Sequence, residues 1–228
     1  TSCTNDHKVF SVLCVRIAFP CANGNNLSQR RAFERTRFSG LIDSRAEGIV
    51  DATGFESSYV SRHFRWKRAK RKKAWHKSWP KVTVFCHRQS HLWAAAHVGR
   101  GPSNDSPAFA PVVRDANALA RWECVMADAA YDCEAHHRLC REELGIAQTL
   151  IPTQTRGSRK WPRSRYRREM KTRFAHDAFG QRWQVESAFS RHKRRLGSFL
   201  RARSEPAKER ECYIRVLTHN LMILAEVA

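Results

Sequence analysis

The stretch Lys81-Val-Thr-Val-Phe-Cys-His-Arg-Gln-Ser-His-Leu-Trp-Ala-Ala-Ala-His-Val-Gly99 decides the fold. Residues 81–88 alternate and are rich in β-branched side chains, which is typical of a half-buried strand. Residues 90–99 predict a second strand, paired with the first as a hairpin across Gln89 and Ser90. A short apolar stretch before this hairpin, residues 48–54, predicts a buried strand that ends in a turn. Residues 48–99 are therefore expected to contain three successive strands.

Strands and helices alternate after this hairpin. The sequence predicts helices over residues 108–120, 133–144, about 178–200 and about 206–226, and further strands over residues 123–128 and 146–151. Residues 153–176 are basic and polar, and we expect no regular element there. The order of these elements is that of an α/β, RNase H-like fold, with a mixed five-stranded sheet flanked by helices.

The last of these helices has an apolar face. Four large aliphatic residues recur on it at helical spacing, so we expect this face to pack against another element. They are Ile214, Leu217, Leu221 and Leu224.

The chain is strongly basic. It has 228 residues, with 42 Lys and Arg against 21 Asp and Glu and a formal net charge of +21. Such an excess attracts a polyanion, and nucleic acid is the first candidate because neutralised phosphates release counterions. An anionic membrane is the second candidate, but no apolar run is long enough to cross a bilayer. Eight cysteines without a CxxC pair or a zinc spacing indicate free thiols in a reducing cytoplasm.

One face of the helix expected at 178–200 carries an aromatic residue, a carboxylate and two cations. Phe179, Arg182, Glu186 and Lys193 are spaced by three, four and seven residues. At about 100° per residue, these side chains fall within roughly 60° of one another on an α-helix. A carboxylate flanked by cations suits a metal ion held beside a phosphodiester. The simpler alternative is an Arg–Glu salt pair, four residues apart, on a solvated face.

Two aspartates lie at the ends of expected strands, Asp51 in the first and Asp128 in the fourth. These strands are neighbours in an RNase H-like sheet, so we expect the two aspartates to face each other. Glu186 would then reach in from the long helix. Phosphodiester cleavage with two metal ions needs acidic ligands that converge in this way. The alternatives are an Asx turn for Asp51 and a helix cap for Asp128, although Asp132 is better placed for that cap.

Two basic segments, residues 62–77 and 156–168, interleave aromatic residues with cations. Phosphate contacts from Lys and Arg, together with stacking from Trp and Tyr, are what a nucleic-acid groove uses. The alternative is a solvated or disordered basic loop, and the position of the segments around the candidate site favours nucleic acid. The candidate DNA contacts in the first segment are Arg65, Lys67, Arg68 and Lys70.

Taken together, these motifs resemble those of one protein family. The chain is similar to the catalytic domain of DDE transposases from bacterial insertion sequences, in the large four/five group. That family carries a Y-(2)-R-(3)-E-(6)-K pattern on a helix, matched here by residues 179–193 with Phe in place of Tyr. Its D-x-(G/A)-(Y/F) motif matches Asp128-Ala-Ala130-Tyr131, and its first Asp, followed by small residues, matches Asp51-Ala-Thr-Gly54. The resemblance covers residues 48–226.

The resemblance implies metal-dependent cleavage at insertion-sequence ends and strand transfer into target DNA, that is, DNA transposition and recombination. Asp51, Asp128 and Glu186 would be the catalytic carboxylates and the ligands of two Mg²⁺ or Mn²⁺ ions. The implied partners are double-stranded DNA, as terminal inverted repeats and target, and a second copy of the chain in a homodimeric synaptic complex. The implied location is the bacterial cytoplasm at the nucleoid, with no membrane partner. The implied DNA contacts on the long helix are Phe179, Arg182, Trp183, Arg191, Lys193, Arg194 and Arg195.

Two departures from the family pattern bear on activity. Phe179 lacks the hydroxyl of the family's Tyr, so a hydrogen bond to a phosphate is lost at that position. Residues 1–40 are interpreted as a poorly defined N-terminal segment, truncated or degraded, ahead of a catalytic domain over residues 41–228. The alternatives are an RNase H-like nuclease that cuts without strand transfer and a decayed copy that only binds DNA. A separation of more than about 10 Å between the carboxyl groups would favour the binding-only alternative.

Overall fold

The computed structural model describes residues 46–57, 78–154 and 161–227, which contain a five-stranded mixed sheet. Its strands are β1 (Glu47–Gly54), β3 (Trp79–His87), β4 (Trp93–Gly101), β5 (Cys124–Ala127) and β6 (Gln148–Leu150). They lie in the order β4-β3-β1-β5-β6. Strand β3 is antiparallel to β1 and β4, whereas β5 is parallel to β1 and β6. The predicted α/β, RNase H-like sheet is confirmed, including the position of β1 beside β5.

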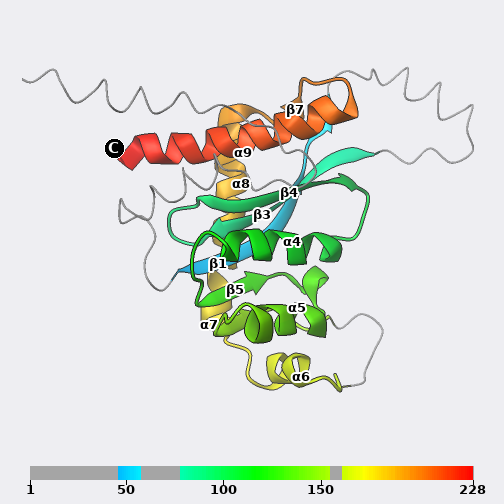
Figure 1. Ribbon diagram of the computed structural model, residues 1–228, viewed down its shortest axis with the longest axis vertical. Helices are drawn as coiled ribbons and strands as arrows, with labels where there is room; N and C mark the ends of the chain where they lie inside the picture. Colours follow the sequence, from blue (N-terminus) through cyan, green and yellow to red (C-terminus); the bar gives the residue numbers. More distant parts are fainter. Residues whose placement is uncertain (1–45, 58–77, 155–160, 228) are drawn as a thin grey trace, which may run out of the picture.

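Helices cover both faces of the sheet (Figure 1). Helices α4 (Ser106–Asn117) and α5 (Glu134–Arg138) pack on one face, and α8 (Trp183–Leu196) and α9 (Glu205–Val227) pack on the other. Ile49 and Val50, successive residues of β1, belong to the cores on opposite faces. Because strand side chains alternate between faces, Asp51 falls on the same face as Ile49, toward α8.

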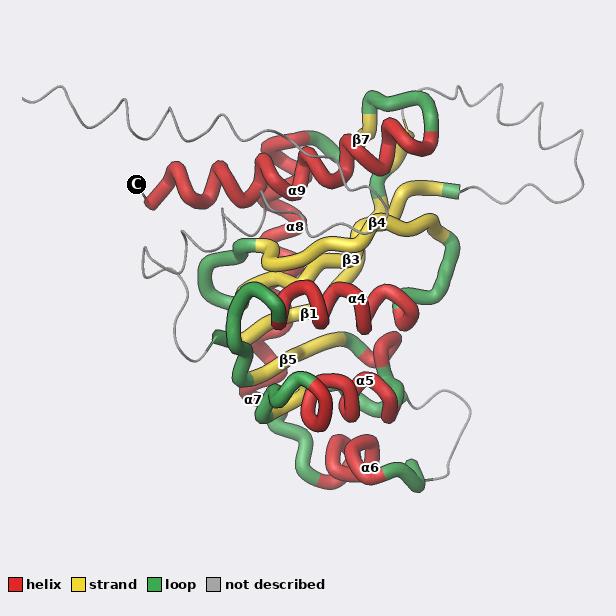
Figure 2. The backbone as a smooth tube through the Cα atoms, in the orientation of Figure 1, coloured by secondary structure: helices red, strands yellow, loops and turns green. Residues whose placement is uncertain are grey.

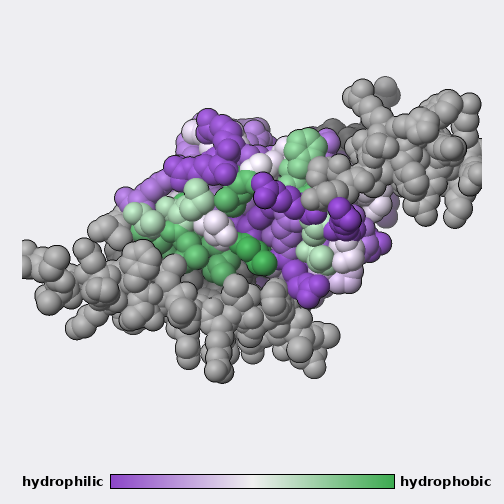
Figure 3. All heavy atoms as spheres, turned by 90° about the horizontal axis from the view of Figure 1, so that it is seen from above, coloured by the Kyte–Doolittle hydropathy of each residue, from purple (hydrophilic) through white to green (hydrophobic). Residues whose placement is uncertain are grey.

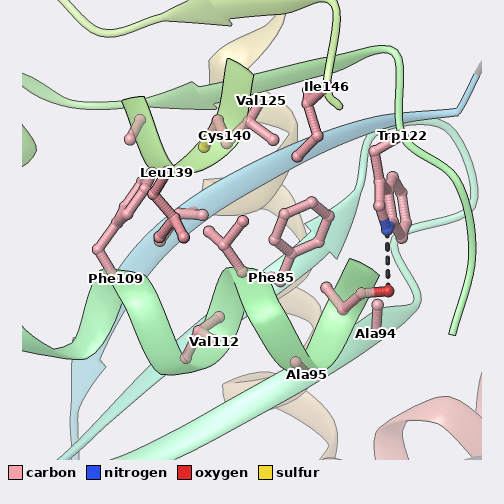
Figure 4. Packing of buried hydrophobic residues seen from close by; sticks show 14 of the residues in the cluster. Phe85, Ala94, Ala95, Phe109, Val112, Trp122, Val125, Leu139, Cys140 and Ile146 are labelled. Atoms are coloured by element: carbon pink, nitrogen blue, oxygen red, sulfur yellow. Dashed lines mark hydrogen bonds between the residues drawn. The ribbon is translucent and has the colours of Figure 1, made fainter. Parts of the chain in front are cut away.

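The core between the sheet and α4 is rich in aromatic residues. Figure 4 shows Phe85 of β3 packed with Phe109 and Val112 of α4. The Phe85 and Trp122 ring centroids are 4.5 Å apart, and the Trp122 indole N–H donates a hydrogen bond to the Ala116 carbonyl at 3.0 Å. A glycine is required at position 48 of β1, because a Cβ atom there would overlap the Phe85 ring.

The core on the opposite face is built around Trp93 of β4. The imidazole of His219, from α9, stacks on the Trp93 indole with 4.2 Å between centroids. His192, from α8, lies 4.7 Å from the same ring. The Asn220 amide accepts a hydrogen bond from the Trp93 backbone N–H and donates one to its carbonyl, each at 2.9 Å. Polar side chains of α9 therefore form part of this core.

The packing face predicted for the last helix is wrong. Ile214 is 40% exposed, and the three leucines of the predicted apolar face, Leu217, Leu221 and Leu224, are only partly buried. The buried residues of α9 are Cys212, Arg215, Val216, His219, Asn220 and Ile223. Helix α9 packs on the sheet through the face that carries His219 and Asn220, because His219 stacks on the Trp93 ring and the Asn220 amide forms two hydrogen bonds with the Trp93 backbone. Figure 3 shows apolar residues gathered among polar ones in the view from above, the side on which α9 lies.

The long helix expected at 178–200 is divided. It begins as the short helix α7 (His176–Phe179), continues as the 3₁₀ turn η3 (Gly180–Arg182), and becomes α8 only at Trp183. Gly197, with φ +82°, ends α8, and Phe199–Leu200 forms strand β7. Strand β7 pairs in parallel with β2 (Glu56–Ser57), which follows β1. The second predicted helix changes in a similar way, from α5 into a π-helical turn over Leu139–Glu143.

A helix, α6 (Arg165–Thr172), lies where the sequence predicts no element; Figure 2 shows it next to α5. Both oxygens of the Glu134 carboxylate accept hydrogen bonds from the first turn of α6, from the backbone N–H groups of Tyr166 and Arg167 at 3.0 Å. Tyr166 and Met170 are the buried residues of α6. Tertiary contacts of this kind stabilise a helix of eight residues, which is too short to be stable in isolation even though most of its residues favour a helix.

Some predicted features lie outside the described residues. These are the N-terminal segment 1–40, the basic segment 62–77 with Arg65, Lys67, Arg68 and Lys70, and residues 156–160 of the second basic segment. Among the helices that the structure describes, none combines the length and the apolar character needed to cross a membrane.

Candidate active site

Asp51 of β1 lies beside Asp128, the residue that directly follows the neighbouring strand β5. In the parallel register of these strands, Val50 is opposite Ala127, and each aspartate is the next residue of its chain. Neighbouring strands are about 4.8 Å apart. The expectation that the first and fourth strands bring the two aspartates together is therefore consistent with the observed register.

The Asp51 carboxylate is 18% exposed and lies among charged groups. Its Oδ1 accepts a hydrogen bond from the adjacent Ala52 N–H at 2.7 Å, which is not the bond of an Asx turn two residues on. Burial raises the pKa of Asp51, and the negative charges of Asp128 and Glu186 add to this effect. The bond from Ala52 and the positive charge of Arg182 oppose it. A cation is therefore favourable beside Asp51.

Asp128 caps the 3₁₀ turn that follows β5. Its Oδ1 accepts a hydrogen bond from the Ala130 N–H at 2.8 Å, so the cap alternative holds for one of its two oxygens. The expectation that Asp132 is better placed to cap the helix that begins near residue 133 is wrong, because Cys133 is at the N-cap position of α5. Both oxygens of Asp132 instead bind the Arg167 guanidinium at 2.7 Å, and one also accepts the Gln154 N–H. Asp132 therefore anchors α6, because its side chain is only 1% exposed and fully engaged.

Arg182 connects the helix to the strand. One guanidinium nitrogen donates to Glu186 Oε1 at 2.7 Å, and the other donates to Asp51 Oδ2 at 3.1 Å. The salt pair of Arg182 and Glu186, four residues apart, is therefore present, but Arg182 also binds Asp51 and so bridges the two carboxylates. Because the two nitrogens belong to one rigid guanidinium fork, the two carboxylate oxygens are within about 8 Å of each other. For the pair Asp51 and Glu186, this separation is below the limit set for the binding-only alternative, and the approach of Glu186 to Asp128 stays a prediction.

The donor set suits a hard divalent cation. Asp51, Asp128 and Glu186 offer carboxylate oxygens, which are the ligands that Mg²⁺ and Mn²⁺ prefer. Within the described part of the chain, no three Asp, Glu, His or Cys side chains are already close enough to hold a metal ion. The Arg182 guanidinium stands between two of the three carboxylates and is a cation in the position that a metal ion would share. The residues therefore fit a divalent ion once the guanidinium moves.

The other predicted DNA contacts near this site differ in exposure. Trp183, the first residue of α8, is 51% exposed, whereas Phe179 is partly buried with its ring centroid 5.0 Å from that of Phe174. The Lys193 ammonium lies 5.7 Å from the centroid of the Phe55 ring, beyond the end of β1. Trp183 and Lys193 are thus on the same helix as Glu186, while Phe179 is packed into the apolar core beside it.

The remaining cations of α8 lie toward its C-terminal end. Arg195 and Arg191 contact the Glu226 carboxylate of α9 at 2.5 and 3.6 Å, so that one acidic residue partly neutralises both. Arg194 is exposed. Arg194 and Arg195 follow Glu186 by more than two helical turns and Arg191 follows it by less than two, which leaves all three as candidates for contacts with the flanking DNA backbone.

A residue pair absent from the predicted site fixes the end of α8. The Arg215 guanidinium donates to the carbonyls of Gly197 and Phe199 and is paired with Glu211 at 2.9 Å. Glu211 also accepts the backbone N–H of Arg201 at 2.9 Å. The i,i+4 spacing of Glu211 and Arg215 is visible in the sequence, but it equally describes an exposed surface pair. Only the buried position of Arg215 shows that the pair holds the turn between α8 and α9.

The chain thus combines an RNase H-like sheet, two carboxylates at adjacent positions on neighbouring strands, and a third carboxylate on a helix that packs on the sheet. The family model described as the transposase DDE domain matches residues 43–221. The chain belongs to this family. The four/five group of bacterial insertion sequences is a finer assignment that stays a prediction.

The chain was also compared with curated proteins and with solved structures. The comparison with curated proteins gave no match. Among solved structures, the chain is similar to one described as a piggyBac transposase synaptic complex with hairpin DNA, with a TM-score of 0.47 and 10% sequence identity. That likeness covers 96% of this chain but only 56% of the other chain, so this chain spans little more than half of that protein's length. A likeness at this level carries no argument about activity.

Proposed function

We propose that the chain is the catalytic domain of a DNA transposase, which cleaves DNA at the ends of a mobile element and joins them to target DNA. The observation that carries the proposal is the bridge of Asp51, Arg182 and Glu186, with Asp51 on β1 beside Asp128, the residue that follows the neighbouring strand β5. Membership of the transposase DDE family supports the same reading. The bacterial insertion-sequence origin, the nucleoid location and the homodimeric synaptic complex belong to this proposal.

Asp51, Asp128 and Glu186 would hold one or two Mg²⁺ or Mn²⁺ ions. When bound, these ions activate a water and stabilise the charge on the phosphodiester. The protein's own part is to fix the carboxylates: Ala52 N–H orients Asp51, Ala130 N–H orients Asp128, and the first turn of α8 carries Glu186. The first reaction frees a 3′-hydroxyl, and the second is its attack on a target phosphodiester. Both depend mainly on positioning and charge stabilisation.

The DNA backbone would lie along α8. Lys193, Arg194, Arg191 and Arg195 supply positive charge, and exposed Trp183 supplies a ring for stacking on an unpaired base. The basic segment with Arg65, Lys67, Arg68 and Lys70 would add contacts to inverted-repeat or target DNA. Affinity should then fall with salt, with a log–log slope of about −0.9 for each phosphate neutralised.

The test uses the full chain with a duplex made from the DNA that flanks its coding sequence, a target plasmid and Mg²⁺. Wild type is expected to nick the duplex and to join it to the plasmid. Asp51→Asn and Glu186→Gln should retain duplex binding and lose both products, whereas Glu123→Gln, which changes an exposed carboxylate before β5, should retain them. Nicking without joined product would favour the RNase H-like nuclease. Duplex binding without nicking by wild type would favour the decayed, binding-only copy, and nicking by Asp51→Asn would refute the site.

A further inference from the structure

Arg182 has two acidic partners that come from different parts of the fold. Glu186 is four residues away on the same helical segment, whereas Asp51 is 131 residues away on β1. The Arg182 side chain is 22% exposed and the Glu186 side chain is 60% exposed, so the bridge opens directly to solvent. Arg182 also ends the 3₁₀ turn η3 rather than lying within the regular part of α8.

A guanidinium and a divalent ion cannot occupy this position together. Both are cations that need the oxygens of Asp51 and Glu186, and in the bridge one oxygen of each carboxylate is bound to a different nitrogen of the guanidinium. Like charges at a few ångströms repel strongly in a partly desolvated site. Binding of the ion therefore requires Arg182 to leave, and the exposed side of the bridge gives its long side chain a path to do so.

We propose that Arg182 is a counter-ion gate: it neutralises Asp51 and Glu186 while no divalent ion is bound, and the ion displaces it toward the DNA backbone. This inference rests on the proposed function and adds a regulation to the same site. The displaced guanidinium carries its charge to the place where a phosphodiester would lie, at the end of α8 that begins with Trp183. Ion binding and DNA binding then strengthen each other, and by thermodynamic linkage each raises the affinity of the other by the same factor.

The gate predicts the effect of removing the charge of Arg182. Arg182→Gln eliminates the competing cation, so its affinity for Mn²⁺ in the absence of DNA should rise by at least about tenfold. Arg182→Lys keeps one charge but lacks the two-pronged fork, and its affinity should fall between those of wild type and Arg182→Gln. Arg114→Gln is the matched control, because Arg114 on α4 is an exposed arginine paired with Glu143 at 3.0 Å, on the other face of the sheet. Its affinity for Mn²⁺ should equal that of wild type.

The experiment measures free Mn²⁺ by electron paramagnetic resonance during titration of each full-length protein, after circular dichroism has shown that each is folded. A second measurement follows the affinity of a fluorescent duplex with and without Ca²⁺, where the factor gained from Ca²⁺ should be smaller in Arg182→Gln than in wild type. Equal or weaker Mn²⁺ binding by folded Arg182→Gln, relative to wild type, overturns the gate alone and leaves the carboxylates as ligands. Absence of Mn²⁺ binding in every protein overturns the gate together with the metal site. If Arg182→Gln is not folded, Arg182→Lys decides between the same outcomes.

Discussion

Replacing His192 by Phe is expected to make the protein less sensitive to acid. His192 is 1% exposed, and its ring lies 4.7 Å from that of Trp93. Neither of its ring nitrogens has a hydrogen-bond partner among the described residues. Burial, followed by the positive charges of His219, Arg215 and Lys193, lowers the pKa of His192 from 6.5 to about 3. The folded protein therefore holds this imidazole neutral where water would protonate it.

The sign of the effect follows from proton uptake. The unfolded chain, with a His pKa of 6.5, binds a proton that the folded state excludes until the pH approaches 3. The stability contributed by neutral His192 is thus complete above pH 6.5 and is lost progressively as the pH falls. Between pH 7 and pH 5, this one group should lower the free energy of unfolding by about 2 kcal/mol. Burial lowers the pKa of His219 to about 4, so it adds a second loss of similar size.

Urea unfolding at pH 7 and pH 5, followed by circular dichroism, measures this loss. The difference between the two pH values should be smaller by about 2 kcal/mol in His192→Phe than in wild type. Ile223→Val, which removes one buried methylene from α9 and no titratable group, should cost about 1 kcal/mol equally at both pH values. Equal pH dependence of wild type and His192→Phe would refute the reasoning.

Two further substitutions test the packing that positions the site. Gly48→Ala should lower the free energy of unfolding by about 2 kcal/mol or more, because the added methyl overlaps the Phe85 ring; an unchanged urea midpoint would contradict this. Arg215→Met should cost about 3 kcal/mol, because it leaves Glu211 without its partner and frees the carbonyls of Gly197 and Phe199. The double variant Arg215→Met, Glu211→Gln should recover part of that loss in the same assay, and additive losses would argue against a coupled pair.

The strands were predictable because local sequence pattern and global packing agree there. The strand predicted at residues 81–88 matches β3, although Val82 to His87 are all buried and the alternation does not mark a solvent-facing side, and Gln89 and Ser90 lie in the turn that leads to β4. The adjacency of Asp51 and Asp128 followed from the order of the elements, since that order fixes which strands are neighbours. Helical spacing grouped Glu186 with Arg182 and Lys193, and only the order of the strands that carry Asp51 and Asp128, with the family pattern, made it a candidate ligand.

The features that were missed depend on contacts between distant residues. The inner face of α9 is set by the pairing of Asn220 with the Trp93 backbone, 127 residues away, and hydropathy alone assigns Asn220 to solvent. Helix α6 is stabilised by Glu134, more than thirty residues earlier. The contact of Arg182 with Asp51 has the same character, because only Glu186 is within its reach along the sequence.

The relative position of Asp51 and Glu186 is held by the chain that follows each of them. Strand β1 continues through Phe55 into β2, and β2 pairs with β7 directly after α8, where the Glu56 N–H donates to the Ser198 carbonyl at 3.1 Å. Lys193 and Arg215 both lie 5.7 Å from the centroid of the Phe55 ring. Sliding α8 along its axis would therefore break the β2–β7 pairing and the contacts to Phe55. Because the backbone beneath both carboxylates is fixed in this way, the long Arg182 side chain is the part of the site best suited to move when an ion arrives.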